Sequence, residues 1–427
     1  MSSRFELRET RLPSGLRVVC APLPHTHRAA VTLHVSSGSR FEPPELGGVS
    51  HFLEHMLHRG TERHRSAHAL ALAFEELGSE LGAATYVDHA VLSAGAPPAH
   101  LDAVIALLGD VVRTPMFTGI DIERGIVREE ILESLNEDGQ PVDADELTMS
   151  LAFPDHGLGR PIAGTIAALN RFDVPTLQRF HAAHYAVETM VVSVAGPIDE
   201  ARVLQAVDAA FAGLPSAEVP HDAPPTPAQG PRFGYVEDAG SQTALRVTFR
   251  APSENDALEP AAELLLRVLD DGMSTRLYHR VCDERGLAYD VSAAYEAFAD
   301  TGLFSISSDC AHGRAEELLS ELFAVAREVR EGGPEPRELE KAKRRFSFQM
   351  QSLFDDPLEL AAFVGLGALT GVARTPEERE AQLLSTTASD VARAARAVFT
   401  ADNLVVAAVG QLTPKRRRAL ERLVSAF

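Results

Sequence analysis

The sequence predicts an α+β fold made of two homologous domains, each a mixed, largely antiparallel sheet with helices packed on one face. Three observations lead to this prediction. Strand-like segments occur in sequence-adjacent pairs with helical segments between them. Residues 216–232 are rich in Pro, Ala and polar groups and carry almost no large apolar side chain, which is typical of a linker. The strand-like segment that ends at Gly196 returns in the second half of the chain, where it ends at Gly410.

The offset from Gly196 to Gly410 recurs elsewhere in the chain. It carries Tyr185 onto Phe399, and it carries Ser36, at the end of one expected strand, onto Arg250, at the end of another. A repeat of this length indicates duplication of a whole domain, because the units of solenoids are far shorter. A chain of 427 residues is long enough to give two domains a core each. We therefore expect an N-terminal domain at 1–215, a linker at 216–232 and a C-terminal domain at 233–427.

Apolar runs and alternation place the strands of the first half. Residues 16–21 and 30–35 are rich in β-branched and apolar side chains, and they predict two strands joined through Pro22 and Pro24. Alternation of apolar and polar residues over 85–94 predicts a single half-buried strand. The continuous apolar run at 189–195 predicts a buried strand that closes this half.

Helical periodicity and helix-breaking residues place the helices. A loop at 38–48, rich in Gly, Pro and acidic residues, leads into a helix through 51–57. Gly78, Thr114-Pro115 and Asp173 mark helix ends or starts farther along the chain. The further helices expected in the first half cover residues 67–77, 100–113, 121–133 and 174–185.

Composition argues against several kinds of partner. The formal net charge of −21 and the pI near 5.2 disfavour nucleic acid or an anionic membrane and are compatible with a basic polypeptide. Cys20, Cys282 and Cys310 are too few and too scattered for a disulfide framework, so they indicate a reducing compartment. No segment has the apolar run of a signal peptide or a membrane span. We expect a cytoplasmic protein that binds neither nucleic acid nor membrane.

The clearest chemical pattern is HFLEH at residues 51–55. On a helix, His51 and His55 lie one turn apart, so their imidazoles face the same way and supply half of a tetrahedral zinc site. Glu54 is close enough to accept a proton without being a ligand. This is the inverted H-x-x-E-H arrangement. The alternative reading is a helix with two solvated histidines, and a third ligand is needed to distinguish the two.

The acidic helix expected at 121–133 offers that ligand. Glu123 and Glu130 are seven residues apart, two turns along one face, so both can point into the same site. We assign Glu130 as the third metal ligand and Glu123 as the carboxylate that orients an imidazole N–H. An acidic solvated helix face is the other interpretation, and it suits Glu129 and Glu133 better.

These residues resemble a known family. HFLEHMLHRGT, followed by Glu123 and Glu130, resembles the inverzincin peptidases of the pitrilysin, insulin-degrading and mitochondrial-processing-peptidase group, known as M16. The segment HGLGRPIAGT at 156–165 is similar to that group's HPLGRP-I-GT segment. GMSTRL at 272–277 and RGLAY at 285–289 are similar to its C-terminal signature. The resemblance covers nearly the whole chain and implies the processing-peptidase-like fold of a small, bacterial-type subunit with two domains.

The resemblance implies a zinc metalloendopeptidase that cleaves peptides or unfolded polypeptide segments. In this hypothesis His51, His55 and Glu130 hold Zn²⁺, and Glu54 takes a proton from a metal-activated water and passes it to the leaving amine. The second half contains no counterpart of the motif, because the matching offset falls on apolar residues at 264–269. We therefore expect one metal site, in the first half.

Two positions depart from the family pattern, and both concern substrate binding. Relatives carry an Arg seven residues before the tyrosine that corresponds to Tyr289, and here that position is Cys282. Relatives carry an Asn at the position of Gly82. Either Arg280 or Arg285 substitutes for the missing Arg, or another chain supplies the missing groups. We expect Tyr289, Arg285 and the Gly82 position to contact substrate.

The family includes pairs in which one subunit carries zinc and a paralogous subunit without the motif supplies the Arg and Tyr. We therefore expect a zinc-bearing subunit of a homodimer, or of a heterodimer with such a paralogue, that acts on a peptide substrate. The competing hypothesis is a non-catalytic member of the family, a scaffold that binds peptide or a partner subunit. A zinc hydrolase with another substrate has no support beyond the metal motif.

Overall fold

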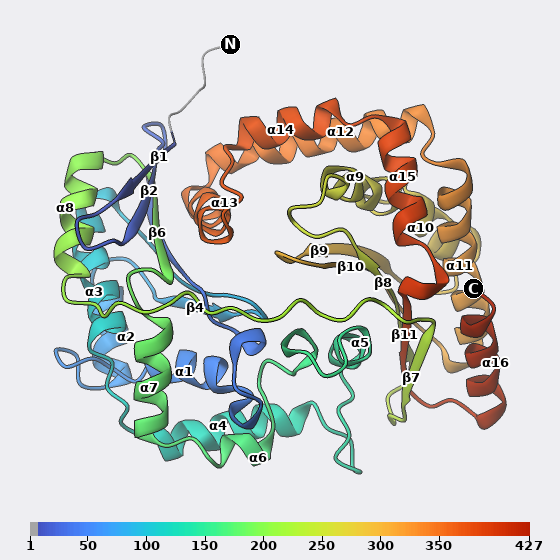
Figure 1. Cartoon of the computed structure of the whole chain (residues 1–427), viewed down its shortest axis with the longest axis horizontal. Helices are drawn as coiled ribbons and strands as arrows, with labels where there is room; N and C mark the ends of the chain where they lie inside the picture. The colour runs from blue at the N-terminus through green and yellow to red at the C-terminus, as the bar shows by residue number, and fades with distance from the viewer. Residues whose placement is uncertain (1–6) are drawn as a thin grey trace. The chain divides into compact units, whose positions relative to one another are not determined.

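The structure is a computed structural model that describes residues 7–427. Its contacts divide the chain into two units, each built on one sheet (Figure 1). Unit 1 comprises Met1–Ile131, Arg160–Asp222 and Met350–Glu378, and unit 2 comprises Leu132–Gly159, Ala223–Gln349 and Arg379–Phe427. Residues 1–6 lie outside the described residues. They begin the expected N-terminal domain and the segment in which we expect no signal peptide.

Sheet 1, in unit 1, has six strands in the order β1-β2-β6-β3-β5-β4. Every neighbouring pair is antiparallel except β2 and β6, which are parallel. The central strands β3 and β6 are buried along their whole length, and helix α13 (Pro357–Thr370) packs on both of them. The strands are β1 (Arg8–Arg11), β2 (Arg17–Pro22), β3 (Ala29–Val35), β4 (Gly82–Thr85), β5 (Ala90–Ala96) and β6 (Met190–Gly196).

Sheet 2, in unit 2, repeats this topology without a counterpart of β1. Its order is β7-β11-β8-β10-β9, and β7 with β11 is its one parallel pair. The offset from Gly196 to Gly410 also carries the start of β3 onto the start of β8 and the start of β6 onto the start of β11. The predicted two-domain α+β fold is confirmed. The strands are β7 (Arg232–Val236), β8 (Thr243–Ala251), β9 (Val291–Ala297), β10 (Gly302–Cys310) and β11 (Leu404–Val409).

The helices follow the expected order in the first half. Those of unit 1 are α1 (Val49–Leu57), α2 (Ala67–Glu75), α3 (Leu101–Arg113), α4 (Ile120–Glu133), α6 (Ile166–Leu169), α7 (Val174–His184), α8 (Glu200–Ala210) and α13 (Pro357–Thr370). Those that lie mostly in unit 2 are α5 (Ala144–Ala152), α9 (Glu259–Leu269), α10 (Arg276–Tyr278), α11 (Ala315–Gly332), α12 (Pro336–Ser352), α14 (Pro376–Ser385), α15 (Ala388–Val398) and α16 (Pro414–Ser425). Among residues 7–427, none of these helices combines the length and the apolar character that a membrane span requires.

Each half of the chain contributes one helix to the sheet of the other half. Helix α13, from the second half, packs on β3 and β6 of sheet 1, and α5, from the first half, packs on β8 and β11 of sheet 2. The two helices begin at nearly equivalent positions of the repeat, Ala144 and Pro357. The compact units are therefore discontinuous in sequence, unlike the contiguous domains expected at 1–215 and 233–427. Residues 214–231, within and beside the expected linker, form neither helix nor strand.

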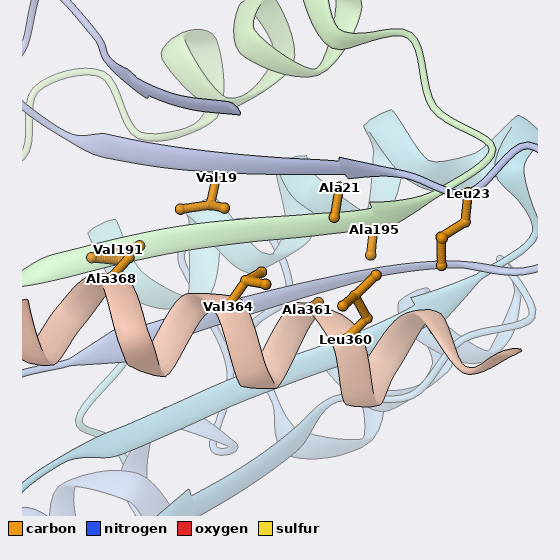
Figure 2. Close-up of a cluster of buried hydrophobic side chains, with 9 residues drawn as sticks. All are labelled: Val19, Ala21, Leu23, Val191, Ala195, Leu360, Ala361, Val364 and Ala368. Carbon is orange, nitrogen blue, oxygen red and sulfur yellow. The ribbon is translucent and has the colours of Figure 1, made fainter. Parts of the chain in front are cut away.

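Helix α13 fits closely onto sheet 1 because the facing side chains are small. Leu360, Ala361, Val364 and Ala368 recur at helical spacing and lie against Val19, Ala21, Val191 and Ala195 of the sheet (Figure 2). The Thr32 hydroxyl donates a 3.3 Å hydrogen bond to the Ala361 carbonyl oxygen. Gly365 lies over the ring of the buried His34, where a Cβ would approach Cδ2 to 2.5 Å.

The prediction of a single strand at 85–94 is wrong. This range contains the end of β4, a turn and the first half of β5, which together form a hairpin. Tyr86 donates its backbone N–H to the carbonyl oxygen of His89 across the two-residue turn Val87-Asp88. Only Thr85 of the predicted range belongs to β4 and residues 90–94 belong to β5, and the turn between them lacks the Gly that marks most two-residue hairpin loops.

We predict that Gly365→Ala lowers the free energy of unfolding by about 1–3 kcal/mol, because the new methyl group would overlap the His34 ring and overpack the interface. Gly367→Ala is the matched control on the same helix, since its Cβ would meet nothing closer than 3.4 Å. That control should be neutral or stabilising by up to about 1 kcal/mol. Urea unfolding of the two variants tests this, and equal stability of Gly365→Ala and the wild type would contradict the packing described.

Candidate metal centre

Helix α1 carries the HFLEH motif and begins under tight constraint. Its N-cap residue, Gly48, has φ of +91°, and a Cβ there would lie 2.5 Å from the Ala163 carbonyl oxygen. The buried Glu42 carboxylate accepts the backbone N–H groups of Gly48 and Ser50, each at 2.7 Å. These bonds satisfy donors that the start of a helix leaves without intrahelical partners. Burial raises the pKa of Glu42, and the bonds from Ser50 and Gly48 oppose that rise.

Residues 159–165 (GRPIAGT), which end the HGLGRPIAGT segment, support the start of α1. Arg160 donates a 2.5 Å hydrogen bond from Nη1 to the Glu42 carbonyl oxygen. At Gly164, with φ of +75°, a Cβ would come within 2.1 Å of the Gly47 carbonyl oxygen. Two glycine-containing backbone segments therefore touch, and this contact fixes where α1 starts. The HGLGRPIAGT segment thus holds the start of α1 in place, and none of its side chains belongs to the proposed ligand set.

The structure brings together the three side chains assigned as metal ligands. His51 and His55 project from the same face of α1, with ring centroids 4.7 Å apart. The Glu130 carboxylate, from α4, lies 3.4 Å from Nε2 of His51 and 3.7 Å from Nε2 of His55. One ligand atom from each residue falls within 4.8 Å of the other two. Zinc ligands at about 2.0–2.2 Å in tetrahedral geometry are separated by roughly 3.3–3.6 Å, so these residues fit a zinc ion.

Glu123, predicted to orient an imidazole, lies beside the ring of His55. Its buried carboxylate lies 3.2 Å from Nδ1 of His55 and accepts a 3.0 Å hydrogen bond from Nη1 of Arg59. A proton on Nδ1 of His55 leaves the lone pair of Nε2 facing Glu130. The negative charge of Glu123 is compensated by Arg59, which permits its burial.

The environment of His51 keeps this imidazole neutral. Burial lowers the pKa of His51 to about 4, and positive charge on His55 acts in the same direction. A neutral ring is the form that binds a metal ion. Nδ1 of His51 is buried and has no hydrogen-bond partner among the described residues, so no carboxylate orients this ring from the Nδ1 side as Glu123 does for His55.

Glu54 lies on the same side of α1 and has a partner that the sequence did not indicate. The Thr85 hydroxyl, at the end of β4, donates a 2.5 Å hydrogen bond to Oε2 of Glu54. His58 follows Glu54 by one helical turn, and its pKa is lowered by burial although the charge of Glu54 opposes the change. The i+4 spacing could have identified His58. Thr85 is 31 residues from Glu54 in the chain, and no sequence pattern links the two.

The inner and outer faces of α4 separate only in part as expected. Val127 and Ile131 are buried together with Glu123, while Glu129 and Glu133 are exposed, and the Glu130 side chain is also 46% exposed. The apolar residues fix the rotation of the helix, and that rotation turns Glu130 toward α1.

The groups expected to bind substrate are only partly present in this chain. Gly82 begins β4 and contributes no side chain, and a Cβ there would lie 2.7 Å from Oγ of Ser93. In unit 2, Arg285 pairs with Glu321 at 2.9 Å, and Arg280 bonds Glu321 and Glu328. Both guanidinium groups are thus engaged by carboxylates of unit 2. Tyr289 is 92% exposed.

The position equivalent to α1 in the second half is an apolar helix. Helix α9 buries Leu264, Leu265, Val268 and Leu269. Of these, Leu265 and Leu269 stand where the offset between the two halves places His51 and His55. The second copy of the domain therefore uses this helix face for packing.

Two family models match parts of this chain. Residues 17–166 match insulinase, peptidase family M16, and residues 171–346 match the peptidase M16 inactive domain. A Streptomyces coelicolor protein described as an uncharacterized zinc protease is 32% identical over 408 residues, which cover 92% of this chain and 87% of the relative. A Bacillus subtilis protein with the same description is 26% identical over 91% of this chain and 95% of the relative. The chain belongs to peptidase family M16.

Solved structures show the same fold. A protease from Helicobacter pylori superposes with a TM-score of 0.90 at 19% identity, covering 95% of this chain and 100% of the other. A peptidase M16 inactive domain from Pseudomonas fluorescens superposes with a TM-score of 0.87 at 22% identity, covering 96% of this chain and 99% of the other.

We predict that the metal-free protein loses stability as the pH falls from 7 to 5, partly through His51. The unfolded ring binds a proton near pH 6.5 and the folded ring only near pH 4, so acid favours the unfolded chain across this window. Between pH 7 and 5, the free energy of unfolding of the wild type should fall by about 2 kcal/mol more than that of His51→Gln. Urea unfolding in EDTA at the two pH values measures this, and identical losses would contradict the burial of a neutral His51.

Proposed function

We propose that this chain is a zinc-dependent endopeptidase that cleaves peptides or unfolded polypeptide segments. The observation that supports it is the convergence of His51, His55 and Glu130 beside Glu54, a carboxylate outside the ligand set. The relatives described as zinc proteases support the same conclusion. The free thiols of Cys20, Cys282 and Cys310 accord with a cytoplasmic location, which is part of the proposal.

The residues of the chain have separate roles in this reaction. A zinc ion held by His51, His55 and Glu130 would lower the pKa of an attacking water and polarise the scissile carbonyl. Glu54 accepts the proton of that water and returns it to the leaving amine. The hydrogen bond from Thr85 fixes the Glu54 carboxylate and leaves its second oxygen for the proton transfer. Glu123 and Arg59 hold the His55 ring in place.

The edge of sheet 1 suits an extended peptide. β4 ends the sheet and, among the described residues, pairs only with β5. Its residues Gly82, Ala83 and Ala84 have small side chains, so another backbone can approach closely. A peptide can add to this edge as a further strand, held by main-chain hydrogen bonds. Thr85 then places the peptide beside Glu54.

We predict that Glu54→Gln retains zinc and loses turnover by about 100- to 10,000-fold, because the amide cannot accept the proton. Glu130→Gln, in contrast, should lose both turnover and the metal. Glu129→Gln is the matched control, since Glu129 is exposed on the same helix as Glu130 and should leave both properties unchanged. Zinc content by atomic emission and cleavage of a mixed peptide library measure these outcomes. Wild-type rates in Glu54→Gln would show that Glu54 is not the base.

We further propose that this chain acts as the zinc-bearing subunit of a dimer. Arg280 and Arg285 are engaged by Glu321 and Glu328, Cys282 carries no charge with which to hold a carbonyl, and Gly82 has no side chain. The substrate-binding groups that the family pattern leads us to expect are therefore incomplete in one chain. A second copy, or a paralogous subunit without the zinc motif, would complete them.

We predict that specific activity rises with the concentration of the purified chain if the partner is a second copy. If the partner is a paralogue, activity appears only when that subunit is added. Activity assays combined with analytical ultracentrifugation over the same concentrations test this. Full activity from a monomer would contradict the dimer. Absence of cleavage with either partner would favour the competing function, a non-catalytic scaffold that binds peptide.

A further inference from the structure

Three polar side chains of sheet 1 lie beneath α13. Thr32 and His34 belong to β3, and Ser193 of β6 is paired with Thr32. All three residues are at most 2% exposed. The helix residues that face them, among them Ala361 and Val364, are apolar (Figure 2). The packing between α13 and the sheet therefore encloses a polar cluster, and the imidazole of His34 is its one basic group.

Hydrogen bonds define which nitrogen of His34 carries a proton. The Thr32 hydroxyl donates its single hydrogen to the Ala361 carbonyl oxygen at 3.3 Å. Toward His34 this hydroxyl is therefore an acceptor, and Nε2 of the ring, 3.1 Å away, is the donor. Nδ1 is left without a proton, and it is buried with no hydrogen-bond partner among residues 7–427. Two hydrogen bonds in series thus connect the neutral ring through Thr32 to the backbone of α13.

A second proton on His34 has no acceptor while α13 covers the ring. The proton would create an N–H at Nδ1, and a buried N–H without a partner is costly. Gly365 lies directly over the ring, where a Cβ would come within 2.6 Å of Nε2. Burial lowers the pKa of His34 to about 3, and positive charge on His89 acts in the same direction.

The elements packed around His34 offer no charge that compensates for a second proton. Val191 of β6 and Val91 of β5 are paired with His34 on either side. Helix α13 presents Gly365 to the ring, and its one acidic residue, Glu359, is exposed. The ring is therefore compatible with this packing only in its neutral form.

The helix over His34 adheres through small side chains. Ala361, Gly365 and Ala368 each bury little apolar surface against the sheet, so each contributes little to docking. If α13 separated from the sheet, water would reach His34 and its pKa would return to about 6.5. The released form therefore binds a proton more readily than the docked form. As the pH falls from 6.5 toward 3, acid favours release.

We propose that His34 is an acid-sensitive latch that releases α13 from sheet 1 when the ring binds a proton. In its neutral form the ring completes the hydrogen bonds through Thr32 to Ala361, and in its charged form it opposes docking. Residues 350–378 belong to unit 1 although they come from the second half of the chain, and α13 is the helix that packs them on sheet 1. Acid would therefore loosen this attachment before the rest of the unit unfolds. The inference does not depend on the proposed peptidase function.

Hydrogen exchange of the α13 amides in the full chain tests the proposal. Mass spectrometry at pH 7 and pH 5, corrected for the intrinsic exchange rates, gives the change in the opening equilibrium of the helix. With a pKa of about 3 in the docked form and about 6.5 in the released form, opening should rise about 25-fold between the two pH values. The amides of α3, in the same unit, report unfolding of the whole unit and should change less.

Two variants identify the titrating group. His34→Gln retains a side-chain N–H but binds no proton, so the increase in α13 exchange should disappear. His68→Gln alters an exposed histidine on α2 and should keep the full increase. The proposal fails if α13 exchange does not rise in acid, if α13 and α3 rise by the same factor, or if His34→Gln responds like the wild type. If circular dichroism shows that His34→Gln does not fold, the comparison of α13 with α3 in the wild type decides the outcome.

Discussion

The buried carboxylate of Glu123 links the two helices from which the site is built. It contacts the His55 imidazole on α1 and the Arg59 guanidinium just beyond that helix, while its own backbone belongs to α4. A charge that is 5% exposed needs such partners, and leaving it unpaired would cost several kcal/mol. The position of Glu130 follows from this constraint, because two turns of one helix separate it from Glu123. The same contact sets the protonated nitrogen of His55, so one interaction determines both geometry and chemistry.

The duplicated domain shows how the two halves have diverged. Both sheets keep the same strand order and the same single parallel pair, and the equivalent helices α13 and α5 cover corresponding strands. The difference lies in the helix that carries the motif in the first half. There α1 turns His51 and His55 toward α4 and Glu54 toward the end of β4, while α9 turns leucine and valine side chains into a core. One copy has a candidate metal centre, and the other has additional apolar packing.

Much of this arrangement could be predicted from the sequence. The motif spacing and the heptad separation of Glu123 and Glu130 depend on helical geometry, which is local and regular, so their convergence was predictable. The strand pairs and the repeat likewise follow from periodicity. The sequence did not reveal the exchange of α5 and α13, because nothing local distinguishes a helix that packs on its own sheet from one that packs on another. The hairpin at Tyr86–His89 was missed for a related reason. Its turn lacks the usual Gly, and tertiary contacts with Gly38 and Arg40 hold it. The partner of Glu54, Thr85, depends on the same hairpin.

The account depends on two imidazoles and one carboxylate sharing a single ion. X-ray absorption at the zinc edge of the purified chain, with the zinc content of the same sample known from atomic emission, measures this directly, since the spectrum reports the ligands around the ion and the zinc content gives the number of ions per chain. The account predicts one zinc per chain, with two imidazole nitrogens and oxygen ligands at about 2.0–2.2 Å. A sulfur ligand, one imidazole or none, or a chain that binds no zinc in the presence of excess metal would contradict it.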